Sequence, residues 1–112
     1  MKPLPKRLII NVTEDLVQQG WHLIYELAWD DPARQPVSLV CPVALAVKTK
    51  LPERNLLYVH PHETGVEIAS GVGAWYRHSK ALTKQIDRFD GDGIHRPTKA
   101  WFKPGRYTMV LI

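Results

Sequence analysis

The sequence predicts an α+β fold in which two or three helices pack on one face of a small, mainly antiparallel sheet. Three observations lead to this fold class. The chain has 112 residues, of which 45% are hydrophobic, enough for a single domain (1–112) with one modest core. Short β-branched and aromatic runs are separated by turn residues, which is typical of antiparallel strands. Two longer segments carry the start residues and apolar composition of helices.

The N-terminal part predicts one strand and one short helix. Residues 1–7 are rich in proline and basic residues and are expected to form a loose tail. The β-branched run 8–12 predicts a strand, and Thr13 can then cap a helix whose first turn carries two acidic residues. Gly20 is expected to end this helix.

The middle of the chain predicts a strand, an excursion and a buried helix. Residues 21–28 alternate in a way that favours a strand, and Pro32 and Pro36 then impose a turn or an excursion. The segment 41–51 is apolar on nearly every side, and Pro42 suits the first helical position. We therefore expect 41–51 to be the central buried helix of the domain.

The second half of the chain predicts three strands in succession. Residues 56–60, 65–69 and 74–77 have the composition of strands. The segments 61–64 and 70–73 between them contain glycine, proline or serine and are expected to be turns. This spacing predicts an antiparallel meander.

One more helix and two strands are expected to complete the domain. Ser79 can cap a helix over 80–89, whose apolar residues recur at the i, i+4 and i+7 positions of one face. Two last strands, 99–103 and 106–111, are expected to be joined at 104–105, a Pro-Gly pair.

Several of these segments together resemble a group of small proteins from bacteriophage genomes that have no assigned activity. The likeness lies in 12–15, Gly20, 41–47 (CPVALAV), the Trp-Tyr pair at 75–76 and 86–90 (IDRFD). It implies a phage or prophage origin and a shared fold, and it carries no catalytic residues. Relative to that group, this chain has an inserted segment at 21–40 and an added strand after residue 104.

The charge distribution points to an anionic partner. The net charge is +4, and all eight basic residues of the second half fall within 77–106. Such a zone suits phosphate, nucleic acid or a nucleotide-like polyanion, and it argues against a DNA mimic. A solvated, merely solubilising surface is the alternative. The predicted phosphate-binding residues are Arg77, Lys80, Lys84, Arg88, Arg96, Lys99 and Lys103, and the predicted stacking residues are Tyr76 and Trp101.

The inserted segment supports a different hypothesis. Trp21, Tyr25 and Trp29 lie in 21–40, and aromatic residues dominate the hot spots of protein interfaces. On this hypothesis the chain is a protein-directed inhibitor of a host system, such as a defence system. It docks through this insertion or through the basic helix onto an acidic partner. The alternative is a flap that covers the core.

No catalytic, metal or cofactor site is predicted. His60, His62 and Glu63 invite a metal hypothesis, but a turn is favoured because no third ligand is specified nearby. The run 90–93 lacks the spacing of a calcium loop and fits a helix end with a turn. Cys41 is expected to be a buried structural cysteine, and a single cysteine excludes an internal disulfide. A non-enzymatic binding protein is therefore predicted.

The sequence also indicates a cellular setting. The longest apolar run, 40–47, is far shorter than the ~20 residues that span a bilayer. The start of the chain lacks the apolar core of a signal peptide. We therefore expect no membrane partner and a location in the cytoplasm of a bacterial host. The oligomeric state has no signature in the sequence.

Overall fold

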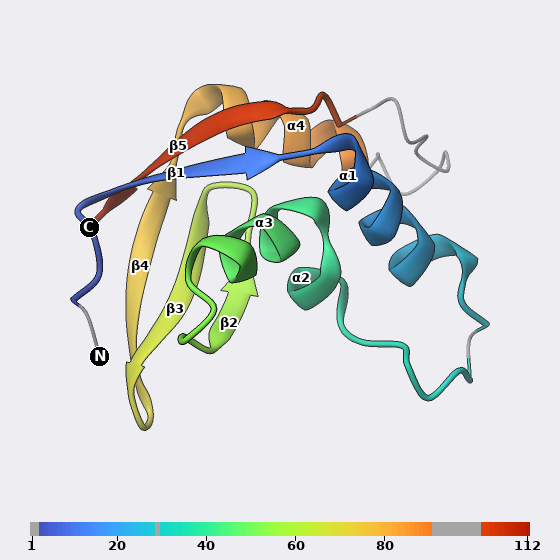
Figure 1. Ribbon diagram of the computed structural model, residues 1–112, viewed down its shortest axis with the longest axis horizontal. Coiled ribbons are helices and arrows are strands. Elements are labelled where there is room, and N and C mark those ends of the chain that lie inside the picture. Colours follow the sequence, from blue (N-terminus) through green and yellow to red (C-terminus); the bar gives the residue numbers. More distant parts are fainter. Residues whose placement is uncertain (1–2, 29, 91–101) are drawn as a thin grey trace.

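The computed structural model describes residues 3–28, 30–90 and 102–112, and it confirms the α+β class. Figure 1 shows a curled sheet with α1, α2 and α3 to one side and α4 behind β5. The elements are β1 (Arg7–Val12), α1 (Glu14–Trp21), the π-helical segment η1 (His22–Glu26), α2 (Val37–Val40), α3 (Pro42–Lys50), β2 (Leu56–Val59), β3 (Glu63–Ala69), β4 (Val72–His78), α4 (Lys80–Asp90) and β5 (Gly105–Leu111).

The five strands form one antiparallel sheet in the order β1-β5-β4-β3-β2. The predicted meander is confirmed as β2, β3 and β4. The prediction for the last two strands is wrong in part: β5 pairs with β1 and β4, and Phe102 and Lys103 are not in a strand. The remainder of 99–103 lies outside the described residues.

Residues 4–7 are attached to the sheet, which corrects the expected loose tail for this part of 1–7, whereas residues 1–2 lie outside the described residues. Arg7 already belongs to β1, and the carbonyl of Lys6 accepts a hydrogen bond from the amide of Leu111 at 2.7 Å. The Tyr76 hydroxyl donates to the Pro5 carbonyl at 2.6 Å, and Leu4 packs against the core. These contacts fix residues 4–7 beside β4 and β5.

The alternation of buried and exposed residues gives the sheet one covered face and one open face. In β1, the side chains of Leu8, Ile10 and Val12 are buried and those between them are exposed. The same period of two in β4 and β5 buries alternate residues, because successive side chains of a strand point to opposite sides. We call the outward side chains of β1, β5 and β4 the open face.

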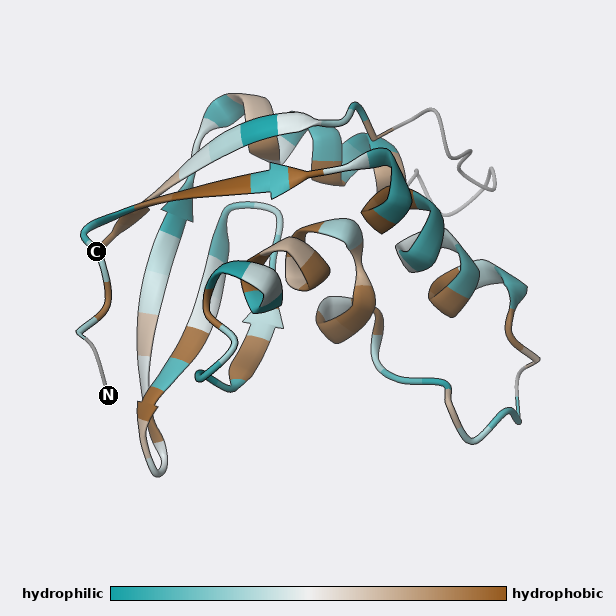
Figure 2. Ribbon diagram, in the orientation of Figure 1, coloured by the Kyte–Doolittle hydropathy of each residue, from teal (hydrophilic) through white to brown (hydrophobic). Residues whose placement is uncertain are grey.

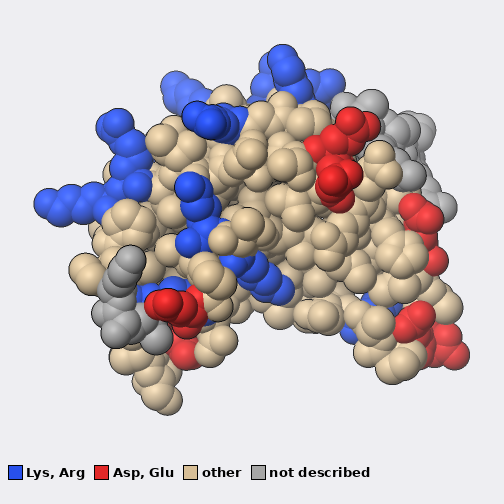
Figure 3. All heavy atoms as spheres, viewed as in Figure 1, with Lys and Arg blue, Asp and Glu red and all other residues tan. Residues whose placement is uncertain are grey.

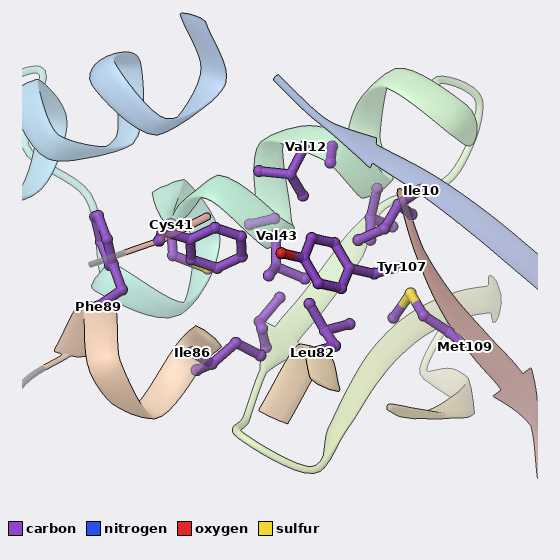
Figure 4. Close-up of a cluster of buried hydrophobic side chains, with 14 of the residues drawn as sticks. Ile10, Val12, Cys41, Val43, Leu82, Ile86, Phe89, Tyr107 and Met109 are labelled. Atoms are coloured by element: carbon purple, nitrogen blue, oxygen red, sulfur yellow. The ribbon is translucent and has the colours of Figure 1, made fainter. Parts of the chain in front are cut away.

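The covered face meets the helices in a single core. Side chains from β1, α3, α4 and β5 converge there, among them Ile10, Val43, Leu82 and Met109, each at most 1% exposed (Figure 4). In Figure 2, α2 and β1 are mostly brown, whereas α1 and α4 carry teal as well, as expected for helices with one side in solvent. The predicted helices over 41–51 and 80–89 are confirmed as α3 and α4.

Gly20 does not end the first helix, and the strand predicted over 21–28 is wrong. The helix continues through Trp21 into η1 and reaches Glu26. Gly20 instead provides a close crossing of α1 over α3, because a Cβ at this position would lie 2.9 Å from Cδ of Pro42. This extension places Ile24 in the core.

The described helices are all too short or too polar to span a bilayer.

Candidate functional site

Three cationic side chains form a ridge along α4. Lys80, Lys84 and Arg88 are all exposed, while the opposite side of the helix buries Leu82 and Ile86. At four residues apart, consecutive members of the ridge are about 6 Å apart along the helix axis. Like charges at this spacing destabilise an isolated helix by a few tenths of a kcal/mol per pair. The packing of the apolar side on the sheet outweighs this small cost.

A hollow of about 650 Å³ lies against this ridge. It is bounded by α4, by the start of β3 and by the end of β4, and we call it the α4 hollow. The three ridge residues and Arg77 line it, together with two carboxylates, Glu63 and Asp87. The surroundings are therefore cationic overall, and the volume is that of a typical small-ligand pocket.

The cations at the α4 hollow are not neutralised by the described part of the protein. Within residues 3–28, 30–90 and 102–112, none of Arg77, Lys80, Lys84 and Arg88 forms a salt bridge. Glu63 stands opposite Arg77 in the register of β3 and β4, and its Oε1 accepts a hydrogen bond from the Tyr58 hydroxyl at 3.2 Å. Among the described residues that line the hollow, four cations thus face two carboxylates, which leaves an excess of positive charge.

A partly buried hydrogen-bond network holds α4 against the turn between β2 and β3. The Pro61 carbonyl accepts from the Thr83 hydroxyl at 2.7 Å and from Nδ1 of His78 at 2.9 Å. Because a carbonyl only accepts, Nδ1 of His78 carries the proton. Nε2 of the neutral ring then accepts from the hydroxyl of Thr64 at 2.6 Å. The Oγ of Ser79 caps α4 by accepting from the amide of Leu82 at 3.2 Å.

His78 makes the stability of the protein depend on pH. Burial lowers the pKa of His78 below its ordinary value of 6.5, although the Pro61 carbonyl and Glu63 act in the opposite direction. When the pH falls below about 6.5, the unfolded chain binds a proton at this ring that the folded chain does not. The free energy of unfolding is therefore expected to fall with decreasing pH, by at most about 1.4 kcal/mol per pH unit.

Urea denaturation between about pH 7.5 and 5.5 measures this dependence. His78→Asn is expected to flatten the slope, because the amide does not titrate. His60→Gln is the matched control, since His60 is exposed, and it should keep the slope of the unsubstituted protein. An equal slope in His78→Asn would show that another group is responsible.

The cationic surface extends from the α4 hollow onto the open face. Arg77 pairs in register with Val110, and Val110 pairs with Arg7 on its other side. Adjacent strands are about 4.8 Å apart, so the backbones of Arg7 and Arg77 are roughly 10 Å apart. Arg106 lies further along β5, and it is exposed on the same face. In Figure 3, Lys and Arg gather mostly over the upper and left part of the molecule, whereas Asp and Glu lie mostly along its right-hand side, with one group at the lower left.

The predicted phosphate-binding residues are only partly brought together. Arg77, Lys80, Lys84 and Arg88 line one hollow, as described above. Lys103 instead lines a second hollow of about 560 Å³, between α1 and residues 102–104, which Arg88 also borders. Arg7 was missed by sequence reasoning, because it is 70 residues away from Arg77 in the chain and only strand pairing brings the two together. The predicted residues Arg96, Lys99 and Trp101 lie outside the described residues.

Tyr76 is not a stacking residue, which corrects the sequence prediction. Its side chain is 0% exposed and belongs to the covered face of β4. Its hydroxyl is bound to the Pro5 carbonyl, and burial raises the pKa of this phenol. A base therefore has no access to the ring.

The aromatic residues of the inserted segment are partly used by the core. Trp21 and Tyr25 are half-buried, and their ring centroids lie 6.3 and 6.1 Å from that of Phe89. The Tyr25 hydroxyl also donates to the Phe89 carbonyl at 3.4 Å. Trp29 lies outside the described residues. The docking hypothesis for 21–40 stays a prediction, and packing explains its two described aromatic residues.

The other candidate groups occupy ordinary positions. His60 and His62 are exposed at the turn between β2 and β3, and no described group of three His, Cys, Asp or Glu side chains could hold a metal ion. Cys41 is 6% exposed and lies in the core at the start of α3 (Figure 4), which confirms that it is buried. Most of the run 90–93 lies outside the described residues.

Comparison with known proteins gives no match: no family model, no curated protein and no solved structure is similar to this chain. The resemblance to bacteriophage proteins stays a prediction, and so does the phage or prophage origin that it implies. A functional proposal depends on the geometry and charge of the α4 hollow and of the open face.

Proposed function

We propose that this protein is a small, non-enzymatic binding protein that engages nucleic acid through the phosphates of its backbone. The observation that carries the proposal is the convergence of Arg77, Lys80, Lys84 and Arg88 on one hollow without a salt bridge among the described residues. Guanidinium and ammonium groups held close together are the usual partners of phosphate.

The arrangement favours an extended anion over an isolated one. The ridge on α4 alone spans about 12 Å from Lys80 to Arg88, and Arg7 and Arg106 continue the positive charge across the open face. A single inorganic phosphate would contact only part of this surface. A chain of regularly spaced phosphates can neutralise several of these cations at once and release their counterions.

The test is the salt dependence of binding to a fluorescein-labelled 20-nucleotide oligomer of random sequence, followed by fluorescence anisotropy. The affinity is expected to fall steeply with salt, because each neutralised phosphate adds close to one unit to the slope of log K against log salt. Lys84→Glu is expected to weaken binding at least tenfold and to lower the slope by about one unit or more.

Lys50→Glu is the matched control, because Lys50 is an exposed lysine at the end of α3, outside the α4 hollow. It makes the same change in net charge and should bind nearly as the unsubstituted protein does. Both variants should keep their melting temperature, since both side chains are exposed. Equal weakening by the two variants would mean that only net charge matters, and the α4 hollow would not be the binding site.

A further inference from the structure

A tryptophan stands on the open face beside the cationic residues. Trp75 of β4 is partly exposed, and its ring lies over the backbone of Gly73. A Cβ at Gly73 would approach this ring to 2.1 Å, so only glycine allows the ring to lie this close to the strand. The Tyr58 ring meets Trp75 edge to face, with centroids 5.9 Å apart at 84°. The backbone of Gly73 and the ring of Tyr58 therefore restrain the Trp75 side chain.

The position of Trp75 connects it with the proposed phosphate site. Trp75 and Arg77 are two residues apart on one strand, so their side chains leave the same face roughly 7 Å from each other. A shallow hollow of about 330 Å³ lies against Trp75 and is also lined by Ile112. Ile112 lines the α4 hollow as well, which makes the two hollows neighbours. The Trp75 ring thus lies next to the cationic residues that line the α4 hollow.

We propose that the ligand is single-stranded nucleic acid, and that one of its bases stacks on Trp75 while the adjoining phosphates reach Arg77 and the ridge on α4. This inference rests on the proposed function. In a duplex the bases are stacked on each other inside the helix and offer no free face to a protein ring. In a single strand they are accessible, and an aromatic platform beside a positive groove is the usual means of binding them.

The surroundings of Trp75 favour this occupant over an apolar protein surface. Arg77, Arg7 and Arg106 share the open face, and none of them forms a salt bridge within the described residues, although Glu63 stands opposite Arg77. An apolar partner would remove this excess of positive charge from water without supplying anions. A polyanion compensates them with its phosphates, and the base covers the apolar ring. The combination of one ring with several cations thus fits a nucleotide chain.

The test compares three oligomers at one low salt concentration by anisotropy: dT12, rU12 and a blunt-ended DNA hairpin with a similar number of phosphates, whose two strands are joined by a linker without bases so that it has no single-stranded loop. Trp75→Leu keeps an apolar side chain over Gly73 but removes the aromatic face, and it is expected to weaken dT12 or rU12 binding roughly tenfold. It should leave the weaker hairpin binding unchanged. The first two oligomers distinguish DNA from RNA as the source of the strand.

A matched control and a second readout accompany this measurement. Val72→Ala removes exposed apolar surface from the same strand, on the opposite face, and should not change the affinity. Tryptophan emission is expected to be quenched when dT12 or rU12 binds, and Trp75→Phe should abolish this quenching while it keeps the fold and most of the affinity. Trp75→Phe therefore tests whether a base stacks on Trp75 even if Trp75→Leu lowers the melting temperature.

The outcomes separate this inference from the proposed function. Unchanged dT12 and rU12 binding in Trp75→Leu, quenching that survives in Trp75→Phe, or equal affinity for the hairpin would overturn stacking on Trp75. The proposed function would stand in each of these cases as long as Lys84→Glu weakens binding. Failure of the unsubstituted protein to bind any of the three oligomers would overturn both.

Discussion

Replacing Phe89 by alanine is expected to lower the free energy of unfolding by about 3–5 kcal/mol. Phe89 is 1% exposed, and it is the centre of an aromatic cluster formed by three parts of the chain. Its ring centroid lies 6.3, 6.1 and 6.0 Å from those of Trp21, Tyr25 and Phe102. Truncation to alanine leaves a cavity that all three rings border, and it removes edge-to-face contacts that add to the area buried.

The measurement is urea denaturation of Phe89→Ala at neutral pH, followed by circular dichroism. Asp87→Ala is the matched control on the same helix, because Asp87 is exposed, and it should change stability by less than about 0.5 kcal/mol. Phe89 also fixes the last turn of α4, so Arg88 is expected to lose its place beside the hollow in Phe89→Ala. A loss below about 1 kcal/mol would mean that the cluster can collapse around the cavity.

Replacing Gly20 by valine is expected to destabilise the protein by roughly 3 kcal/mol. A Cβ at this position would lie 2.9 Å from Cδ and 3.0 Å from the backbone nitrogen of Pro42. The backbone nitrogen cannot move aside as the end of a flexible side chain can, so α1 and α3 must separate. Separation of these helices disturbs the packing of Val17 and Val43, which are at most 2% exposed.

Thermal unfolding of Gly20→Val and of Gln19→Val tests this crossing. Gln19 precedes Gly20 in α1 and is exposed, so Gln19→Val introduces the same side chain into this helix without a steric conflict, at a propensity cost of a few tenths of a kcal/mol. Gly20→Val has no such cost, because glycine is the poorer helix former, so its loss of stability reports the steric conflict. The melting temperature of Gly20→Val should fall by more than 10 °C, and that of Gln19→Val by a few degrees at most. Similar melting temperatures for the two variants would contradict the close approach of the two helices.

Elements whose signals are local were predictable from the sequence. Pro42 at a first helical position located α3, and the spacing of Leu82, Ile86 and Phe89 located α4. The turns around Pro61 and Gly71 separated β2, β3 and β4. Each of these signals acts within one turn or one hairpin, so no knowledge of the tertiary structure was needed.

The sequence-based predictions are wrong where tertiary contacts determine the end of an element or its partners. Gly20 is a common sign of a helix end, yet here it serves the contact with Pro42, and the helix continues into η1. The partners of β5 follow from the curl of the whole sheet, which no local pattern encodes. Such contacts override the intrinsic preference of a segment.

The candidate site shows the same division. The spacing of Lys80, Lys84 and Arg88 predicted the ridge, but the hollow beside it depends on the turn at Pro61 and cannot be found in α4 alone. Tyr76 and Trp75 are neighbours in the chain, and the pleat turns their side chains to opposite faces of β4. A prediction that is off by one residue therefore chooses the buried Tyr76 as the stacking residue in place of the partly exposed Trp75.

The place of β5 between β1 and β4 also determines the order in which the molecule can be assembled. β1 is synthesised before the other described elements, yet its partner in the sheet, β5, is the last of the described strands. β1 cannot pair with β5 until all the residues between them have been synthesised, and pairing between such remote segments slows folding. α3 also contacts β1 in the folded protein and can shield its apolar residues before β5 is available. Apolar segments that are still unpaired during synthesis are prone to aggregation.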